Sequence, residues 1–310
     1  MFSALTKPNY PKAAIGFEQT GITALALQKE RRRRLGIKQG ATIALPDGLL
    51  QPSFLERNIS NSSQFQVLLE EAAVTSGLMN QKRWSVSLPG NTARSAILTL
   101  DAEPKSKQET IEMIEWKAEQ SFGASAGELR LTTRKITPDK DRKSRYFATA
   151  VKLSVIDEYE SIFEGFGWKA GLILPRAVSE ANWISKSDAS RDSLLISSQN
   201  DGFTALLFRG DEPAVVRSVT CAENERDDEI YRLLMFYRDR VADENGGLLE
   251  KLLIIGKEIS ASRIREVSAE AMGRALGILS PEDVGLLIPA NSLAFDDIAA
   301  PAGLAALGFR

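Results

Sequence analysis

The 310-residue sequence contains no histidine and only one cysteine, Cys221. The absence of histidine excludes Ser-His-Asp and Cys-His catalysis, histidine-containing zinc sites and acid–base chemistry on imidazole. A single cysteine cannot form a disulfide within the chain, so a reducing compartment is the expected environment. The chemistry that remains open uses carboxylates, lysine, tyrosine or a bound nucleotide.

Long apolar runs are also absent. No window approaches the roughly 18 apolar residues that a transmembrane helix requires. Residues 1–10 lack the apolar stretch of a secretory signal peptide. We therefore expect a cytoplasmic protein. With 43% hydrophobic residues, this length is enough for one large domain or two of ordinary size.

Positive charge is scarce in the second half of the chain. Residues 1–150 carry 22 Lys and Arg against 15 Asp and Glu, a net charge of +7, whereas residues 151–310 carry 17 against 26, a net charge of −9. The basic first half indicates an anionic neighbour, and the acidic second half argues against general nucleic-acid binding.

The densest basic segment lies between two predicted strands. It comprises Lys29, Arg31, Arg32, Arg33, Arg34 and Lys38. Two interpretations remain open. The segment is either a solvated hairpin tip or a surface attracted to the anionic inner leaflet of a membrane, at about 1 kcal/mol per basic residue.

The order of predicted elements repeats once along the chain. Alternation and turn residues predict three strands, a helix and a strand at Ala13–Glu18, Ile22–Leu27, Ala41–Leu45, 62–76 and Trp84–Leu88. The same order returns at Leu194–Ser198, Thr204–Arg209, Ala214–Val219, 223–241 and Leu252–Ile255. This duplication is typical of the α/β actin-like ATPase fold, in which two ribonuclease-H-like domains face a cleft.

Additional elements interrupt the first copy. Residues at about 91–166 predict the order β-α-β-β-α, and the capping box of Ser106 and Glu109 begins the first helix. We expect Trp116 and Phe122 of that helix to lie in the core; the alternative is that some of these side chains line a groove for a partner peptide. The polar segment 186–192 is interpreted as an interdomain connection. The predicted division is therefore a first domain at 1–186, with an inserted subdomain at about 91–166, and a second domain at 187–310.

Three segments resemble a known family. Trp84–Gly90 is similar to a strand that ends in Pro-Gly, Ile114–Gln120 to a helix with an E-A-E-Q motif, and Phe147–Val151 with Val155–Gly171 to a strand-helix segment. Together they resemble the type IV pilus assembly protein PilM family. These are actin-like proteins related to the cell-division protein FtsA and to the cytoplasmic domain of the type II secretion protein GspL.

The resemblance identifies the turns that would hold a nucleotide. Each of two strand-to-strand turns needs a carboxylate for Mg²⁺ and glycines that let backbone N–H groups approach phosphate oxygens. The family has Asp-x-Gly in both turns, a lysine soon after the first, and a Gly-Gly pair near adenosine. In the first turn, the aligned positions of this chain are Glu18, Thr20, Gly21 and Thr23, and Leu25 stands in place of the lysine. In the second turn they are Ser197, Ser198 and Gln199. The Gly-Gly pair near adenosine corresponds to Gly256 and Lys257.

These changes predict that the chain does not hydrolyse ATP and has no catalytic residue, metal or cofactor. The loss of a carboxylate that would hold the metal, and the addition of side chains where the backbone must approach phosphate, each cost a few kcal/mol of binding free energy. An alternative remains. Asp201, followed by Gly202, could supply the missing acid, so that ATP and Mg²⁺ still bind. No Gly-x-x-x-x-Gly-Lys-[Ser/Thr] motif offers another phosphate site.

The function implied by the resemblance is a cytoplasmic scaffold of type IV pilus assembly, peripheral to the inner membrane. It would bind the cytoplasmic tail of a PilN-type inner-membrane protein on the first domain, in a groove between its core and the inserted subdomain, and link the motor to the alignment complex. The pilus motor ATPase is a further expected partner, as is the anionic membrane surface through Arg31, Arg32, Arg33 and Arg34; nucleic acid is not. The alternatives are a functional actin-like ATP-binding protein and a GspL-like component. The latter is disfavoured because GspL-like proteins continue into a transmembrane helix.

Overall fold

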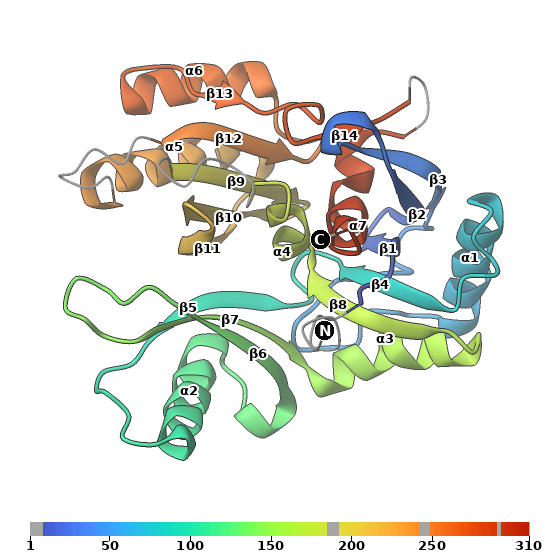
Figure 1. Cartoon of the computed structure of the whole chain (residues 1–310), viewed down its shortest axis with the longest axis horizontal. Helices are drawn as coiled ribbons and strands as arrows, with labels where there is room; N and C mark the ends of the chain where they lie inside the picture. Colours follow the sequence, from blue (N-terminus) through green and yellow to red (C-terminus); the bar gives the residue numbers. More distant parts are fainter. Residues whose placement is uncertain (1–8, 185–191, 242–248, 290–292, 310) are drawn as a thin grey trace. The chain divides into compact units, whose positions relative to one another are not determined.

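The computed structural model describes residues 9–184, 192–241, 249–289 and 293–309. The chain forms two compact units (Figure 1). Unit 1 comprises Met1–Thr92, Val155–Trp183 and Pro281–Arg310, and unit 2 comprises Ala93–Ser154 and Ile184–Ser280.

Unit 1 is built on a mixed six-stranded sheet of order β14-β3-β2-β1-β4-β8. Its strands are β1 (Ala13–Glu18), β2 (Gly21–Lys29), β3 (Leu35–Ala44), β4 (Arg83–Leu88), β8 (Lys169–Pro175) and β14 (Leu286–Leu287). The first three strands are antiparallel, whereas β4 runs parallel to β1 and β8 parallel to β4. The three predicted strands are therefore present, and β2 and β3 are longer than predicted.

Two helices cover one face of this sheet, α1 (Ser62–Thr75) and α3 (Leu153–Gly165). The ring of Phe17 on β1 lies 5.4 Å from the rings of both Phe65 on α1 and Tyr159 on α3, and 6.3 Å from that of Phe163. All four side chains are almost fully buried. This aromatic cluster fixes both helices against β1.

The opposite face is covered by α4 (Arg176–Ala181) and α7 (Phe295–Leu307). Gly16, which precedes Phe17 and so faces the other side of β1, lies against Pro301 of α7, and a Cβ atom at Gly16 would come within 2.8 Å of that proline. Gly303 likewise lets α7 approach α4, because a Cβ there would lie 2.2 Å from the carbonyl oxygen of Ser179. The C-terminal helix α7 therefore packs on unit 1.

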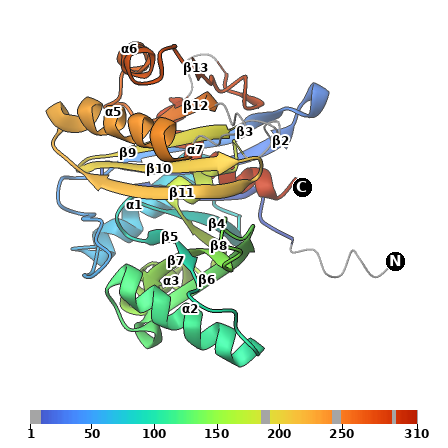
Figure 2. The same cartoon turned by 90° about the vertical axis from the view of Figure 1, so that its left-hand side faces the viewer.

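Unit 2 contains a five-stranded sheet of order β11-β10-β9-β12-β13. Its strands are β9 (Asp192–Gln199), β10 (Gly202–Arg209), β11 (Glu212–Thr220), β12 (Leu249–Ile255) and β13 (Gly277–Ile278). Figure 2 shows α5 (Arg226–Phe236) and α6 (Ala261–Met272) along one face. Leu194 and Ile196 pack there against Ile230 and Ile264 in one buried cluster. The predicted order of three strands, a helix and a strand is confirmed, and α6 follows β12.

A separate three-stranded sheet belongs to the same unit. It has the order β5-β7-β6, formed by β5 (Arg94–Thr99), β6 (Leu129–Ile136) and β7 (Arg145–Lys152), with α2 (Lys107–Phe122) packed on it. The β6–β7 hairpin contacts β11, since the amide of Thr137 donates to Glu212 at 2.8 Å and Arg145 donates to the carbonyl of Ala214 at 3.1 Å. As predicted, Ser106 caps α2 by accepting from the amide of Glu109 at 3.0 Å.

The compact units group the chain differently from the predicted domain ranges. The predicted insertion at 91–166 includes α3, whose Tyr159 and Phe163 contribute to the core of unit 1. The three-stranded sheet groups with residues 184–280, and residues 281–310 group with the first part of the chain. The predicted boundary at 186 and the polar connection up to residue 191 lie outside the described residues, so the predicted ranges stay a prediction.

Candidate functional site

The first predicted nucleotide turn is a tight hairpin in unit 1. Glu18 of β1 pairs with Gly21 of β2, and Gln19 and Thr20 form the exposed turn between them. Gly21 starts β2 where a Cβ atom would lie 3.2 Å from the carbonyl oxygen of Ile43. Close packing against β3 therefore accounts for this glycine without any phosphate.

Thr23 lies further along β2, away from solvent. Its side chain is 4% exposed, and its hydroxyl is 2.9 Å from the hydroxyl of Thr42 on β3. A hydroxyl that is buried and bonded within the sheet is not presented to a ligand. The structure thus brings Glu18, Thr20 and Gly21 together at one turn and places Thr23 inside the sheet.

Glu18 is held by an arginine of the same unit. Its Oε2 lies 3.2 Å from Nη1 of Arg176, and Nε of Arg176 lies 2.8 Å from Oε1 of Glu180, whose side chain is fully buried. The guanidinium, itself only 10% exposed, sits between the two carboxylates. A divalent cation approaching Glu18 would meet this fixed positive charge at close range, and such repulsion is strong where water is scarce.

The second predicted turn and the adenosine position lie together in unit 2. Ser197 and Ser198 lie near the end of β9 with buried side chains, and Gln199, the last residue of β9, pairs with Gly202 across the turn to β10. The hydroxyl of Ser198 donates to Glu258 at 2.9 Å. The loop after β12 therefore contacts the end of β9.

Gly256 makes that contact possible. Its φ of +133° is a backbone conformation open to glycine, and an added Cβ would lie 2.2 Å from Cβ of Ser198. Lys257 follows on the exposed part of the loop. The structure therefore brings Ser197, Gln199, Gly256 and Lys257 into one region of unit 2.

A buried arginine supports the β9–β10 turn. Arg226, the first residue of α5, is 2% exposed, and its Nη2 donates to the carbonyl oxygens of Gln199 at 3.1 Å and Asn200 at 3.4 Å. Its Nε and Nη1 are buried and have no hydrogen-bond partner in the described part of the chain. Asp201, the alternative acid, lies exposed at the turn, where its carbonyl accepts from the amide of Cys221 at 3.0 Å.

Arg176 and Arg226 were missed by reasoning from the sequence. Arg176 and Glu180 form an i, i+4 pair of opposite charge, a spacing that predicts an ion pair along a helix. The ion pair between Arg176 and Glu18 joins residues that are far apart in sequence, so no local sequence pattern predicts it. Arg226 stands in the acidic stretch Glu223–Glu229, which favours a helix N-terminus but gives no indication of a contact with the β9–β10 turn.

The basic hairpin lies where it was predicted. Arg31 to Arg34 connect β2 to β3, all four side chains are exposed, and Arg32 and Arg33 have φ values of 58° and 60°. The amide of Glu30 donates to the carbonyl of Arg34 at 2.9 Å and closes the hairpin. The turn therefore presents four adjacent cations to solvent.

The prediction for α2 was half right. Phe122 is buried, but Trp116 is 52% exposed and lies near the ammonium of Lys117, 5.1 Å from the ring centre. At 100° per residue, Trp116 is turned about 200° from the buried Ile114 and Ala118, so it belongs to the outer face of the helix.

Within the described ranges, no group of three or more cysteine, aspartate or glutamate side chains is arranged to hold a metal ion. In the same ranges, no helix combines the length and the apolar character needed to cross a bilayer.

No protein-family model matches the chain, and no curated protein matches its sequence. Solved structures share its fold. The PilM–PilN type IV pilus biogenesis complex has a TM-score of 0.75 at 14% identity, covering 98% of this chain and 100% of that one. The cytoplasmic domain of EpsL, an inner membrane component of the type II secretion system of Vibrio cholerae, has a TM-score of 0.48 at 10% identity, with 96% and 93% covered. The predicted actin-like fold is confirmed, and the resemblance to the PilM family is confirmed at the level of the fold.

Proposed function

We propose that the chain is an actin-like scaffold of type IV pilus assembly, or of a related secretion machine, that works without hydrolysing ATP. The observation that carries the proposal is the fold shared with the PilM–PilN complex over nearly the full length of both chains. The segments Trp84–Gly90 and Ile114–Gln120, which resemble the PilM family, point the same way.

The first nucleotide turn supports the absence of ATP hydrolysis. In an ATP-binding protein of this fold, the carboxylate at this position would hold Mg²⁺ or its water. Here Glu18 faces Arg176 at 3.2 Å. The second turn has serine rather than aspartate at its start, and the side chain of Ser198 is bonded to Glu258. We propose that neither turn retains a metal or a nucleotide cofactor.

The proposed partner is the cytoplasmic tail of a PilN-type inner-membrane protein, bound by the first half of the chain. Such a tail is disordered when free and loses conformational freedom on docking, so a few apolar side chains must enter pockets to offset that loss. The chain would act at the cytoplasmic face of the inner membrane. There it could also meet the pilus motor ATPase and so link the motor to the alignment complex.

A deletion tests where the tail binds. The segment 93–152 carries the three-stranded sheet and α2, and the variant replaces it by a short linker. The deletion must not extend into α3, because Tyr159 and Phe163 belong to the core around Phe17. Capture of an immobilised tail peptide should be lost, while circular dichroism shows that the remainder is folded. Capture by the folded deletion variant would contradict this placement.

The basic hairpin supports a peripheral association with an anionic membrane. Replacing Arg31 to Arg34 by glutamine should reduce sedimentation with vesicles containing phosphatidylglycerol and leave binding of the tail peptide unchanged, because each cation contributes about 1 kcal/mol near an anionic surface. The matched control replaces exposed arginines elsewhere, such as Arg57, Arg217 and Arg265. Equal losses in both variants would show a general charge effect and refute a role for the hairpin.

A further inference from the structure

The strands β1, β4 and β8 are neighbours in the sheet of unit 1 and run parallel to one another. Parallel neighbours begin at the same edge of a sheet. Each of these three strand starts carries exposed cations, which are Lys12 before β1, Lys82 and Arg83 at β4, and Lys169 at β8. The topology therefore gathers at one edge four cations from three separate parts of the sequence.

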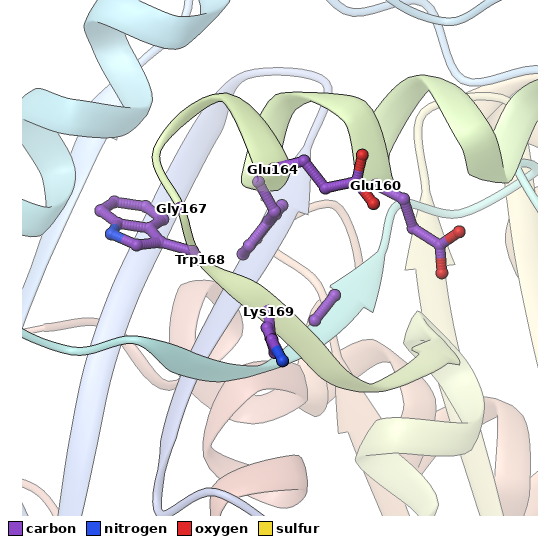
Figure 3. A pocket seen from close by; sticks show the side chains of 7 residues that line it. Glu160, Glu164, Gly167, Trp168 and Lys169 are labelled. Atoms are coloured by element: carbon purple, nitrogen blue, oxygen red, sulfur yellow. The ribbon is translucent and has the colours of Figure 1, made fainter.

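Contacts between the three strand starts keep these cations near one another. The amide of Lys169 donates to the carbonyl of Lys82 at 2.8 Å, and Lys169 is paired with Arg83 across the sheet. A Cβ atom at Gly171 would lie 3.5 Å from the ring of Pro11, just before β1, and 3.7 Å from the guanidinium of Arg83. Figure 3 shows the side chain of Lys169 at this end of β8. The four cations therefore belong to one surface.

The basic hairpin lies at the same edge, because β2 is antiparallel to β1 and so ends where β1 begins. The amide of Leu27 donates to the carbonyl of Lys12 at 3.2 Å, and Lys29 and the hairpin follow Leu27 closely. Neighbouring strands are about 4.8 Å apart, so the cations extend over roughly 20 Å from β8 to β3. We call this surface the basic edge; it comprises Lys12, Lys29, Arg31, Arg32, Arg33, Arg34, Lys82, Arg83 and Lys169.

The positive charge of the basic edge is not neutralised by ion pairs. Within the described ranges none of its cations lies in a salt bridge, and the ammonium of Lys12 lies 4.8 Å from the ring centre of Phe309, a contact that keeps its charge. The acidic side chains nearby are fewer. Glu30 accepts from Gln28 at 2.8 Å, and the others are Glu164 at the end of α3 and Glu282 and Asp283 before β14. The edge therefore carries a net positive charge.

We propose that the basic edge is the surface by which the chain lies on an anionic membrane, with these strand ends facing the lipid headgroups. The proposal rests on the membrane association proposed above, and it adds four cations outside the hairpin and one fixed orientation. A bilayer presents laterally mobile anions over any distance, so it suits cations that are spread along an edge. Nucleic acid is a poorer fit, because residues 151–310 carry a net charge of −9.

Sedimentation of the full chain with vesicles of phosphatidylglycerol and phosphatidylcholine tests the added cations. The edge variant replaces four of them by glutamine, namely Lys12, Lys82, Arg83 and Lys169, and should bind about tenfold more weakly or less. The matched control replaces Lys105, Lys107, Lys135 and Arg142, which are exposed on other elements, and should keep its affinity. If the edge variant binds like the unchanged protein, this proposal fails, even where the hairpin variant loses binding. If the unchanged protein does not sediment with these vesicles, the membrane association itself fails as well.

Acetylation of lysines, followed by mass spectrometry, tests the orientation on the unchanged protein. With the anionic vesicles present, Lys12, Lys82 and Lys169 should react more slowly than in solution, whereas Lys105 and Lys107 should keep their rates. Vesicles of phosphatidylcholine alone should protect none of them, because the attraction is electrostatic. Equal protection of all five lysines, or protection of the edge by a DNA duplex but not by the anionic vesicles, would overturn the proposal.

Discussion

Nη1 of Arg176 lies 3.2 Å from Oε2 of Glu18, at the turn where proteins of this fold that bind ATP hold a metal ion. Because Nε of the same guanidinium contacts the fully buried Glu180 at 2.8 Å, the cation is fixed from two sides. The carboxylate of the first turn thus serves the packing of α4 against β1.

Replacing Arg176 by alanine should destabilise the protein strongly. The change leaves the buried carboxylate of Glu180 without this cation, and breaking a buried pair from one side costs about 3–5 kcal/mol of unfolding free energy. Urea denaturation measures it. The control is Arg263→Ala, whose partners Asp227 and Glu266 are exposed, and which should cost about 1 kcal/mol or less. Similar losses in both variants would show that the Arg176 cluster is not a buried ion pair.

Calorimetry with Mg-ATP should give no affinity tighter than about millimolar, equivalent to a binding free energy of about −4 kcal/mol. The physical reason is that Glu18 is already paired and that Ser197 and Gln199 offer no acid to a metal ion. As a control for copurified ligand, the titration is repeated with protein that has been dialysed extensively against a chelator. A micromolar affinity would refute the proposal that the turns are inactive.

The glycine at the adenosine position should matter for stability. Gly256→Ala forces an alanine to adopt a φ of +133° and brings its Cβ to 2.2 Å from Ser198, a strain of about 1–3 kcal/mol. Thermal unfolding measures the loss. Gly127→Ala is the matched control, because nothing lies within 4 Å of the added Cβ. If Gly256→Ala is as stable as the control, the described contact between the loop and β9 is wrong.

Acid should weaken the contact between the β6–β7 hairpin and β11. Hydrogen bonds from the hydroxyl and then the amide of Thr137 hold the pKa of Glu212 below its usual value, aided by Arg134 and Arg145 and opposed by burial. A carboxylate whose pKa is lowered by folding adds stability above its unfolded pKa, and this stability is lost as pH falls through the folded pKa.

The variant Glu212→Gln separates this effect from general acid denaturation. The unchanged protein should be the more stable at pH 7, and its advantage should disappear at a pH below about 4, the usual range of glutamate. Denaturation at both pH values measures the difference. Glu115→Gln, at an exposed position on α2, should show no such dependence. An advantage of Glu212 that persists at low pH would contradict the assignment.

The order of strands and helices along the chain followed from local patterns. Alternation located β1, β9 and β10 closely, and the glycine at position 21 marked the start of β2. The fold class followed because the same order of elements occurs twice. Such features depend on residues close in sequence, which is why one sequence was enough.

Long-range contacts could not be predicted in the same way. Nothing near Glu18 in the sequence indicates Arg176, and nothing near Thr137 indicates Glu212. The contact between the rings of Tyr159 on α3 and Phe17 on β1 likewise joins residues that are far apart in sequence. Trp116 was expected in the core together with Phe122, although its angular position on α2 places it opposite Ile114.

The central claim is that this chain binds the tail of a PilN-type membrane protein. Isothermal titration of the full chain with a synthetic tail peptide of such a protein from the same genome tests it most directly, with a scrambled peptide as control. We expect saturable one-to-one binding at micromolar affinity with a negative heat-capacity change, because apolar side chains are buried. No heat of binding above the scrambled peptide, with the chain shown to be folded, would contradict the account.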